Sequence, residues 1–143
     1  MFQKLIHTEN NIAALIARVF LGIAILPHGL QKLLGMFGGH GFAGTVEGMS
    51  ATGIPSFIVV LVIIGESFGS LGLILGFITR FCAASISIIM VGAILTTNAK
   101  NGFFASNGGI ELNLLALGLA LIPVIYGGGT LSIDRALSSK KEI

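Results

Sequence analysis

The hydrophobic pattern of the chain predicts four membrane-spanning helices. Apolar residues dominate four runs, which lie at about residues 12–34, 55–77, 81–98 and 110–126 and are separated by polar or glycine-rich segments. At ~1.5 Å of rise per residue, the first two runs are long enough to cross ~30 Å of hydrocarbon as helices. We therefore expect an all-α integral membrane four-helix bundle. Residues 1–143 would form a single membrane domain, with residues 127–143 as a polar tail.

Composition supports an integral membrane protein. Hydrophobic residues make up 54% of the 143 residues and charged residues only 10%, which is far from the balance of a soluble globular domain. The formal net charge of +2 is spread over both ends and the loops and forms no basic stripe. We therefore expect the lipid bilayer as a partner, and no nucleic acid.

The distribution of Lys and Arg predicts how the chain is oriented. One side of the predicted spans carries Lys4, Arg80, Arg135, Lys140 and Lys141, whereas the other carries Lys100 and the boundary residue Lys32. Because positively charged loops stay in the cytoplasm, both termini are expected to be cytoplasmic. The glycine-rich loop at residues 35–53 would then lie outside.

Cysteine and histidine usage excludes several redox cofactors. Cys82 is the single cysteine, so an internal disulfide, a CxxC relay and an iron–sulfur cluster held by this chain alone are not expected. Of the three histidines only His28 falls within a predicted span, which argues against a haem clamped by two histidines across the bilayer. We expect no metal site and no covalently bound cofactor. Any redox cofactor would be diffusible, such as a quinone, or carried by another subunit.

Two opposite charges lie inside the first two predicted spans. A charge near the middle of a bilayer costs from about 2.5 to above 10 kcal/mol and therefore needs a partner. Counting residues from the span ends places Arg18 ~9 Å and Glu66 ~13 Å from the inner face, within reach of an arginine side chain. We expect a bidentate Arg18–Glu66 salt bridge. Both a structural role in helix register and a functional role as a proton or headgroup site are open for this pair.

A second group of polar residues is predicted near the outer face. It comprises His28, Lys32, Asn98, Glu111 and Asn113, which reach similar depth on three helices. Histidine titrates near neutral pH and lysine can hold an anionic oxygen, so with Glu111 they could bind and protonate a quinone or another small polar headgroup. Glu66 and His28 are the catalytic candidates. The alternative is ordinary interfacial polarity, with Lys32 extending to water and Glu111 serving the start of its helix.

Glycine spacing and local signals predict the packing. Gly65, Gly69, Gly72 and Gly76 repeat at helical spacing and form a smooth stripe along which another helix can approach closely. Asn10 or Asn11 could cap the first span. Residues 42–49 read as a short amphipathic helix on the surface, and Cys82 as a small buried residue.

The combination of motifs resembles the DoxX family of bacterial membrane proteins. The motifs are R-x-x-x-G (Arg18, Gly22), H-G-x-x-K (His28, Gly29, Lys32), G-E-x-x-G-x-x-G-L (Gly65, Glu66, Gly69, Gly72, Leu73) and G-x-x-T-R (Gly76, Thr79, Arg80). The resemblance covers about residues 12–127. It implies a four-helix, multi-pass protein of the bacterial inner (cytoplasmic) membrane, related to the DoxD-type subunit of thiosulfate:quinone oxidoreductase. It also implies a role in quinone-linked, sulfur or oxidative-stress redox work.

These observations lead to one main hypothesis and two rivals. The main hypothesis is a redox-associated subunit that binds a quinone or similar small molecule inside the bundle. Arg18 and Glu66 would organise the pocket, and its outer mouth would be lined by His28, Lys32, Glu111 and Asn113. Whether the chain is itself an enzyme stays open; if so, it would be an oxidoreductase subunit linked to quinone. The first rival is a non-enzymatic scaffold that recruits partner proteins, and the second is a transporter. Redox partner proteins and a homo-oligomer are candidate partners.

Overall fold

The predicted all-α class is confirmed by a computed structural model that describes residues 6–139. These residues contain helices and turns but no strand. The long elements are α2 (Ile12–Leu34), α4 (Ser56–Ile64), α5 (Ser70–Leu75), α6 (Thr79–Ala93) and α7 (Glu111–Tyr126). A π-helical turn, η2 (Gly65–Gly69), joins α4 to α5, and a second, η3 (Ile94–Asn98), extends α6. The shorter elements are α3 (Gly41–Ala51), α8 (Ile133–Ser139), η1 (Met36–Gly38), η4 (Ala99–Asn101) and η5 (Ala105–Asn107).

The helices coincide closely with the predicted spans. Three continuous helical stretches are long and apolar enough to cross a membrane, namely Ile12–Leu34, Ser56–Leu75 and Thr79–Asn101. The fourth apolar helix, α7, has 16 residues and is shorter than these three. The short helix predicted at residues 42–49 is present as α3.

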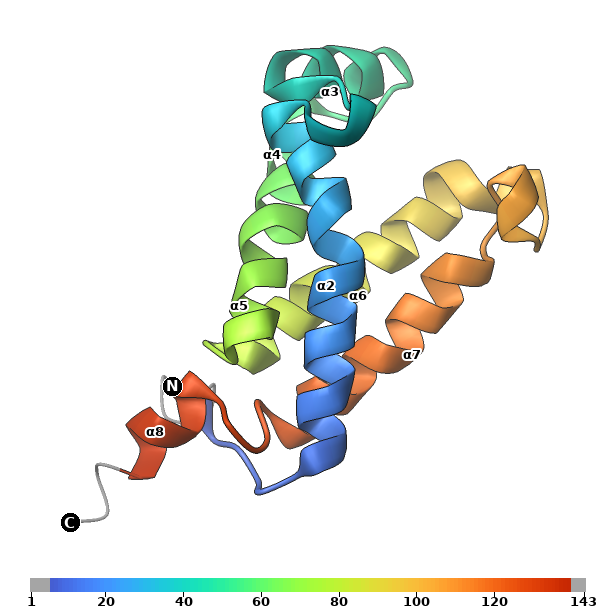
Figure 1. The fold of residues 1–143 in the computed structure, drawn as a ribbon. Coiled ribbons are helices and arrows are strands. Elements are labelled where there is room, and N and C mark those ends of the chain that lie inside the picture. Colours follow the sequence, from blue (N-terminus) through green and yellow to red (C-terminus); the bar gives the residue numbers. More distant parts are fainter. Residues whose placement is uncertain (1–5, 140–143) are drawn as a thin grey trace.

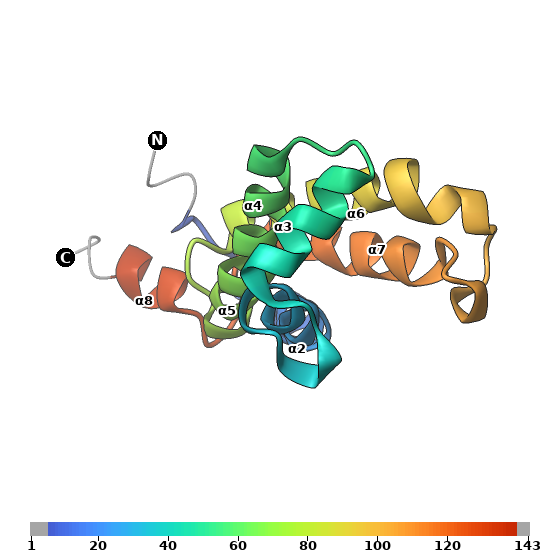
Figure 2. The same cartoon turned by 90° about the horizontal axis from the view of Figure 1, so that it is seen from above.

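The long helices are arranged as two diverging pairs. In Figure 1, α2 runs beside α4 and α5, whereas α6 and α7 lean away together from the end where α8 lies. α6 packs along α7 and touches η2 and α5, while α4 packs on α2, α3 and η2. α3 covers one end of the first pair, called the α3 end below, as the view in Figure 2 also shows. The C-terminal half of α6 thus leans away from α4 (Figure 1).

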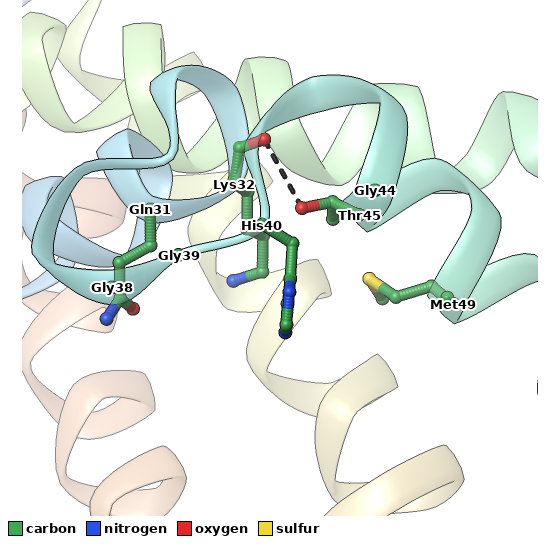
Figure 3. A pocket seen from close by; sticks show the side chains of 9 residues that line it. Gln31, Lys32, Gly38, Gly39, His40, Gly44, Thr45 and Met49 are labelled. Atoms are coloured by element: carbon green, nitrogen blue, oxygen red, sulfur yellow. Dashed lines mark hydrogen bonds between the residues drawn. The ribbon is translucent and has the colours of Figure 1, made fainter.

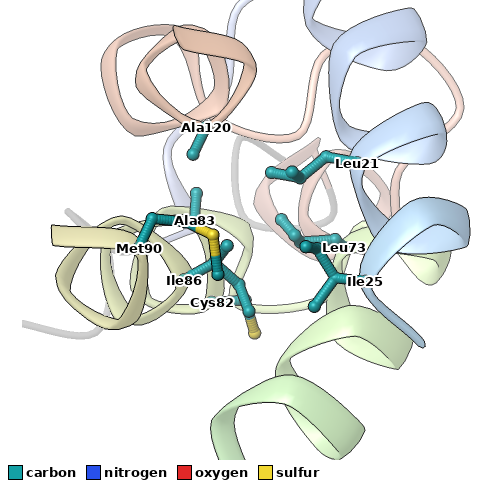
Figure 4. Packing of buried hydrophobic residues seen from close by; sticks show 8 residues of the cluster. All are labelled: Leu21, Ile25, Leu73, Cys82, Ala83, Ile86, Met90 and Ala120. Carbon is teal, nitrogen blue, oxygen red and sulfur yellow. The ribbon is translucent and has the colours of Figure 1, made fainter. Parts of the chain in front are cut away.

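The hydrophobic core lies where the two pairs meet. Its side chains come from α2, α5, α6 and α7 (Figure 4). They are Leu21, Ile25, Leu73, Cys82, Ala83, Ile86, Met90 and Ala120. The prediction that Cys82 is a small buried residue is confirmed, since it is 5% exposed.

Glycines permit close contacts on two faces of the second helical stretch. A Cβ atom at Gly29 of α2 would lie 2.6 Å from the backbone nitrogen of Ser67. On the other face, Cβ atoms at Gly65 and Gly72 would lie 2.5 Å from the Ile89 and Cys82 side chains of α6. Glycine is needed at Gly29, because the atoms that a Cβ would meet there belong to the backbone. At Gly65 and Gly72 the nearest atoms belong to side chains, so a Cβ there would require these side chains to shift.

The segment after α7 folds back onto the start of α2. The Asn11 side chain accepts a hydrogen bond from Ala14 at 3.1 Å and caps α2, as predicted. The Gly129 nitrogen donates to the Thr8 hydroxyl at 2.6 Å, and the Glu9 nitrogen donates to the Tyr126 carbonyl at 3.1 Å. The beginning of the predicted tail is therefore part of the folded structure. Lys4, Lys140 and Lys141, used above for orientation, lie outside the described residues.

Candidate functional site

The predicted Arg18–Glu66 salt bridge is wrong. Arg18 is 1% exposed, and its guanidinium donates hydrogen bonds of 2.6 to 3.4 Å to five backbone carbonyls instead of a carboxylate. The acceptors are Leu73, Ile74, Gly128, Thr130 and Leu131.

The position of these carbonyls explains why Arg18 needs no acidic partner. Leu73 and Ile74 belong to the last turn of α5, which ends at Gly76 in the left-handed conformation (φ 68°). Carbonyls in the last turn of a helix lack the usual partners within the helix and carry the negative end of its dipole, although that of Leu73 also accepts from the Gly76 nitrogen at 3.3 Å. The remaining acceptors come from the segment after α7 that folds back. Arg18 therefore joins α2, α5 and this segment, which is a structural role.

Glu66 instead forms an ion pair with Lys32. The Lys32 ammonium donates a hydrogen bond to one carboxylate oxygen of Glu66, linking the C-terminal end of α2 to the π-helical turn η2. The two side chains differ in exposure, because that of Lys32 is 26% exposed and that of Glu66 only 7%. The pair thus connects a buried carboxylate to a cation that reaches the surface of the protein.

The π-helical turn presents Glu66 at this position. Such turns insert an extra residue into a helix and occur often at functional sites. The Ser70 hydroxyl donates to the Glu66 carbonyl, which satisfies part of the widened turn. Gly29 lies directly against the backbone of Glu66 and Ser67, so α2 contacts the turn without a side chain between them. Lys32, one turn further along α2, is thereby brought over the Glu66 carboxylate.

A groove opens where α6 diverges from α4. This lateral groove has a volume of about 670 Å³ and extends from Ile54 and Met49 at the α3 end to Ile78 and Phe81. Its lining is mostly apolar and includes Ile58, Leu61, Val62, Gly65, Phe68, Cys82, Ile88, Ile89 and Ala93. Lys32 and Glu66 are the only charged residues among the described residues that line it. Residues of both π-helical turns, η2 and η3, face this groove.

A second, more polar hollow lies at the α3 end. This α3 hollow has a volume of about 400 Å³ and lies between the C-terminal end of α2, the following loop and α3 (Figure 3). Its lining is Gln31, Lys32, Gly38, Gly39, His40, Gly44, Thr45, Gly48 and Met49. The Thr45 hydroxyl donates to the Lys32 carbonyl at 3.3 Å, which holds α3 against α2. Lys32 lines both the α3 hollow and the lateral groove.

Of the other residues predicted for the outer polar group, Asn98 lines the lateral groove with Lys32, whereas His28, Glu111 and Asn113 do not. Asn98 donates to the Gly108 carbonyl at 2.7 Å, and Glu111 accepts from the Ala105 nitrogen at 2.8 Å, so both stabilise the loop between α6 and α7. Asn113 donates to the Met90 sulfur at 3.7 Å. His28 is exposed on α2. Of the six predicted ligand-binding residues, the structure brings together Lys32 and Glu66. The lateral groove and the α3 hollow are lined by none of the other four, which are Arg18, His28, Glu111 and Asn113.

Asp134 is a buried acidic residue that sequence reasoning missed. Its carboxylate, 1% exposed, accepts hydrogen bonds from Ile78 and Thr79 at 2.7 and 2.8 Å and so caps α6 from α8. Ile78 has a left-handed conformation (φ 41°), which exposes these donors. The sequence signal was an acidic residue in the tail, which alone does not identify the helix that it caps.

Comparison with known proteins identifies the relatives of this chain. A sequence model of the DoxX family matches residues 13–99. The chain is 31% identical to the inner membrane protein YqjF of Escherichia coli (strain K12), over 92% of this chain and 96% of that protein. It is 29% identical to a Bacillus subtilis (strain 168) protein named "Putative oxidoreductase CatD", over 87% of this chain and 86% of that protein. An uncharacterized membrane protein of Mycobacterium tuberculosis, Rv3486, is 28% identical over 97% of this chain and 90% of its own length. No solved structure matches the chain significantly.

Proposed function

Because this chain belongs to the DoxX family and is a multi-pass protein of the bacterial inner membrane, we propose that it is a redox-associated subunit that binds a quinone or a similar small molecule. The binding site would be the lateral groove between α4 and α6, with Lys32 and Glu66 holding the polar part of the ligand. The groove with this one ion pair is the observation that carries the proposal.

The dimensions and chemistry of the groove suit such a ligand. Binding pockets for small molecules commonly have volumes of ~300–1,000 Å³ and combine an apolar lining with a few polar groups. The groove, at about 670 Å³, lies in this range. A quinone has an apolar ring with carbonyl oxygens, and the Lys32 ammonium can donate to one of them.

The groove is also accessible from the hydrocarbon. Ile58, Leu61 and Ile88 line it and are exposed on helices long and apolar enough to cross a membrane. A ligand dissolved in the bilayer could therefore enter sideways between α4 and α6, with its apolar tail remaining in lipid. When bound, a quinone supplies reversible two-electron chemistry that the side chains of this chain do not supply themselves.

The relatives give separate support for a redox association. The Bacillus subtilis relative carries the word oxidoreductase in its name, at 29% identity. Electrons would reach or leave the bound ligand through partner proteins of the redox system. The chain would then supply the binding site in the membrane.

Ligand titration tests the proposal. We would reconstitute the protein into lipid nanodiscs and titrate a short-chain quinone by calorimetry, comparing wild type with Lys32→Met. Loss of one charged hydrogen bond, worth ~1.5–3 kcal/mol, should weaken binding about tenfold or more. Lys100→Met is the matched control, because Lys100 is exposed in η4 and lines neither the lateral groove nor the α3 hollow.

Two results would contradict the proposal. One is the absence of quinone binding to wild type, and the other is equal affinity in wild type and Lys32→Met. Recovery of a stoichiometric partner protein in mild detergent, with no ligand binding at all, would favour the scaffold instead.

A further inference from the structure

The lateral groove and the α3 hollow meet at Lys32 and Met49, which line both. The Lys32 side chain is 26% exposed, whereas the Glu66 carboxylate that it binds is 7% exposed and lines only the groove. Lys32 is therefore the charged side chain that connects the buried Glu66 carboxylate to the α3 hollow.

The lining of the α3 hollow is suited to water. Gln31, His40 and Thr45 provide polar groups, and glycines at four lining positions expose backbone. His40 and Gly48 are exposed, so the hollow communicates with the solvent at the α3 end. A cavity of about 400 Å³ that contains these polar groups is large enough to hold several water molecules.

We propose that Lys32 and Glu66 form a proton relay between the lateral groove and water in the α3 hollow. The relay rests on the proposed function in one respect: the ligand of that proposal would be the group in the groove that releases or accepts the proton. The positive-inside rule predicts that the α3 end faces the outside, so protons would be exchanged with that side.

The transfer of one proton balances within the pair. A hydroxyl in the groove loses its proton, and the new O–H bond forms on a Glu66 carboxylate oxygen. Lys32 Nζ gives one of its three protons to a water molecule in the α3 hollow and then accepts the proton held by Glu66. The ion pair is thereby restored, and one proton has moved from the groove to water with no change in oxidation state.

Few other titratable groups lie around the pair. His40 lines the α3 hollow, and Cys82 of α6 lines the groove. His28 of α2 and Glu47 of α3 are exposed. α4 contains no titratable side chain. Lys32 is thus the charged group in direct contact with the carboxylate.

Side-specific infrared titration tests the relay without any ligand. Proteoliposomes would be sorted by labelling Ala43→Cys, which is exposed on α3, in a Cys82→Ser background. The carboxyl bands that disappear in Glu66→Gln report Glu66. A pH change on the α3 side should alter these bands rapidly, whereas the same change on the opposite side should act slowly. Lys32→Met should abolish the rapid response.

A pair of glycine variants tests whether the α3 hollow is the route. Added Cβ atoms at Gly48 of α3 and Gly118 of α7 both point into open space, but only Gly48 lines the hollow. Gly48→Phe should slow the response severalfold, and Gly118→Phe should leave it unchanged. Equal rates in these two variants, an equally rapid response from the opposite side, or no response in wild type would overturn the relay. Loss of quinone binding with this response intact would instead remove only the proposed function.

Discussion

Lys32 of α2 and Glu66 of η2 form an ion pair in which the cation reaches the surface and the carboxylate is buried. The buried Glu66 carboxylate therefore depends on Lys32 to compensate its charge. Lys32→Met should destabilise the protein by about 2 kcal/mol, less than the ~3–5 kcal/mol for breaking a fully buried pair, because Lys32 is partly exposed. The double variant Lys32→Met with Glu66→Gln should lose less than the sum of the two single losses. Thermal unfolding in detergent measures this cycle, and additive losses would show that the pair is not coupled.

Replacing Arg18 with lysine should lower the stability of the protein. Its guanidinium serves five carbonyls in different directions, whereas an ammonium group has three donors on a flexible stem. We expect Arg18→Lys to cost about 2–3 kcal/mol, since hydrogen bonds to charged groups are worth ~1.5–3 kcal/mol each. The melting temperature in detergent tests this, with Arg135→Lys as the control at a partly exposed site. Equal stability of Arg18→Lys and wild type would contradict the structural role.

Gly29 should be sensitive to a single methyl group. A Cβ atom would lie 2.6 Å from the Ser67 nitrogen and 2.7 Å from the Glu66 carbonyl carbon, both in the backbone. Gly29→Ala should therefore push α2 from η2 and cost about 1–3 kcal/mol, as overpacking commonly does. Gly118→Ala, whose Cβ meets open space, is the matched control and should be neutral or slightly stabilising. A neutral Gly29→Ala would show that the helices do not approach as closely as described.

Asp134 should contribute to stability through the start of α6. Asp134→Ala removes both acceptors for Ile78 and Thr79 and should cost about 1–2 kcal/mol, in the range of helix caps. Asp134→Asn retains one oxygen acceptor and should lose less. Hydrogen exchange at the Ile78 and Thr79 amides would report the effect locally. Unchanged protection in Asp134→Ala would contradict the cap.

The spans could be predicted from sequence because each is a long apolar run, and hydrogen bonds within the run satisfy its backbone. The hydrogen-bond acceptors of Arg18 could not be predicted, because the depth of a residue along the membrane normal does not show which groups lie beside its side chain. Every residue offers a carbonyl, so the acceptors at the end of α5 and in the returning segment leave no sequence signal. The helices also diverge in a way that hydropathy does not encode.

The partner of Glu66 did leave a signal. Arg18, Gly22, Gly29 and Lys32 fall on one stripe of the first helix, and its glycines indicate close contact with a neighbour. A lysine one turn beyond such a glycine faces that neighbour too. This reasoning adds Lys32 to Arg18 as a candidate partner of Glu66.

Photo-crosslinking tests most directly whether the lateral groove is the ligand site. An azidoquinone would be irradiated with the protein in nanodiscs, and the labelled peptides would be identified by mass spectrometry. The groove predicts labels on Ser56–Leu75 and Thr79–Asn98 that are lost when excess unmodified quinone is added and are reduced in Lys32→Met. Labels confined to Glu111–Tyr126, or labels that excess quinone does not displace, would contradict it.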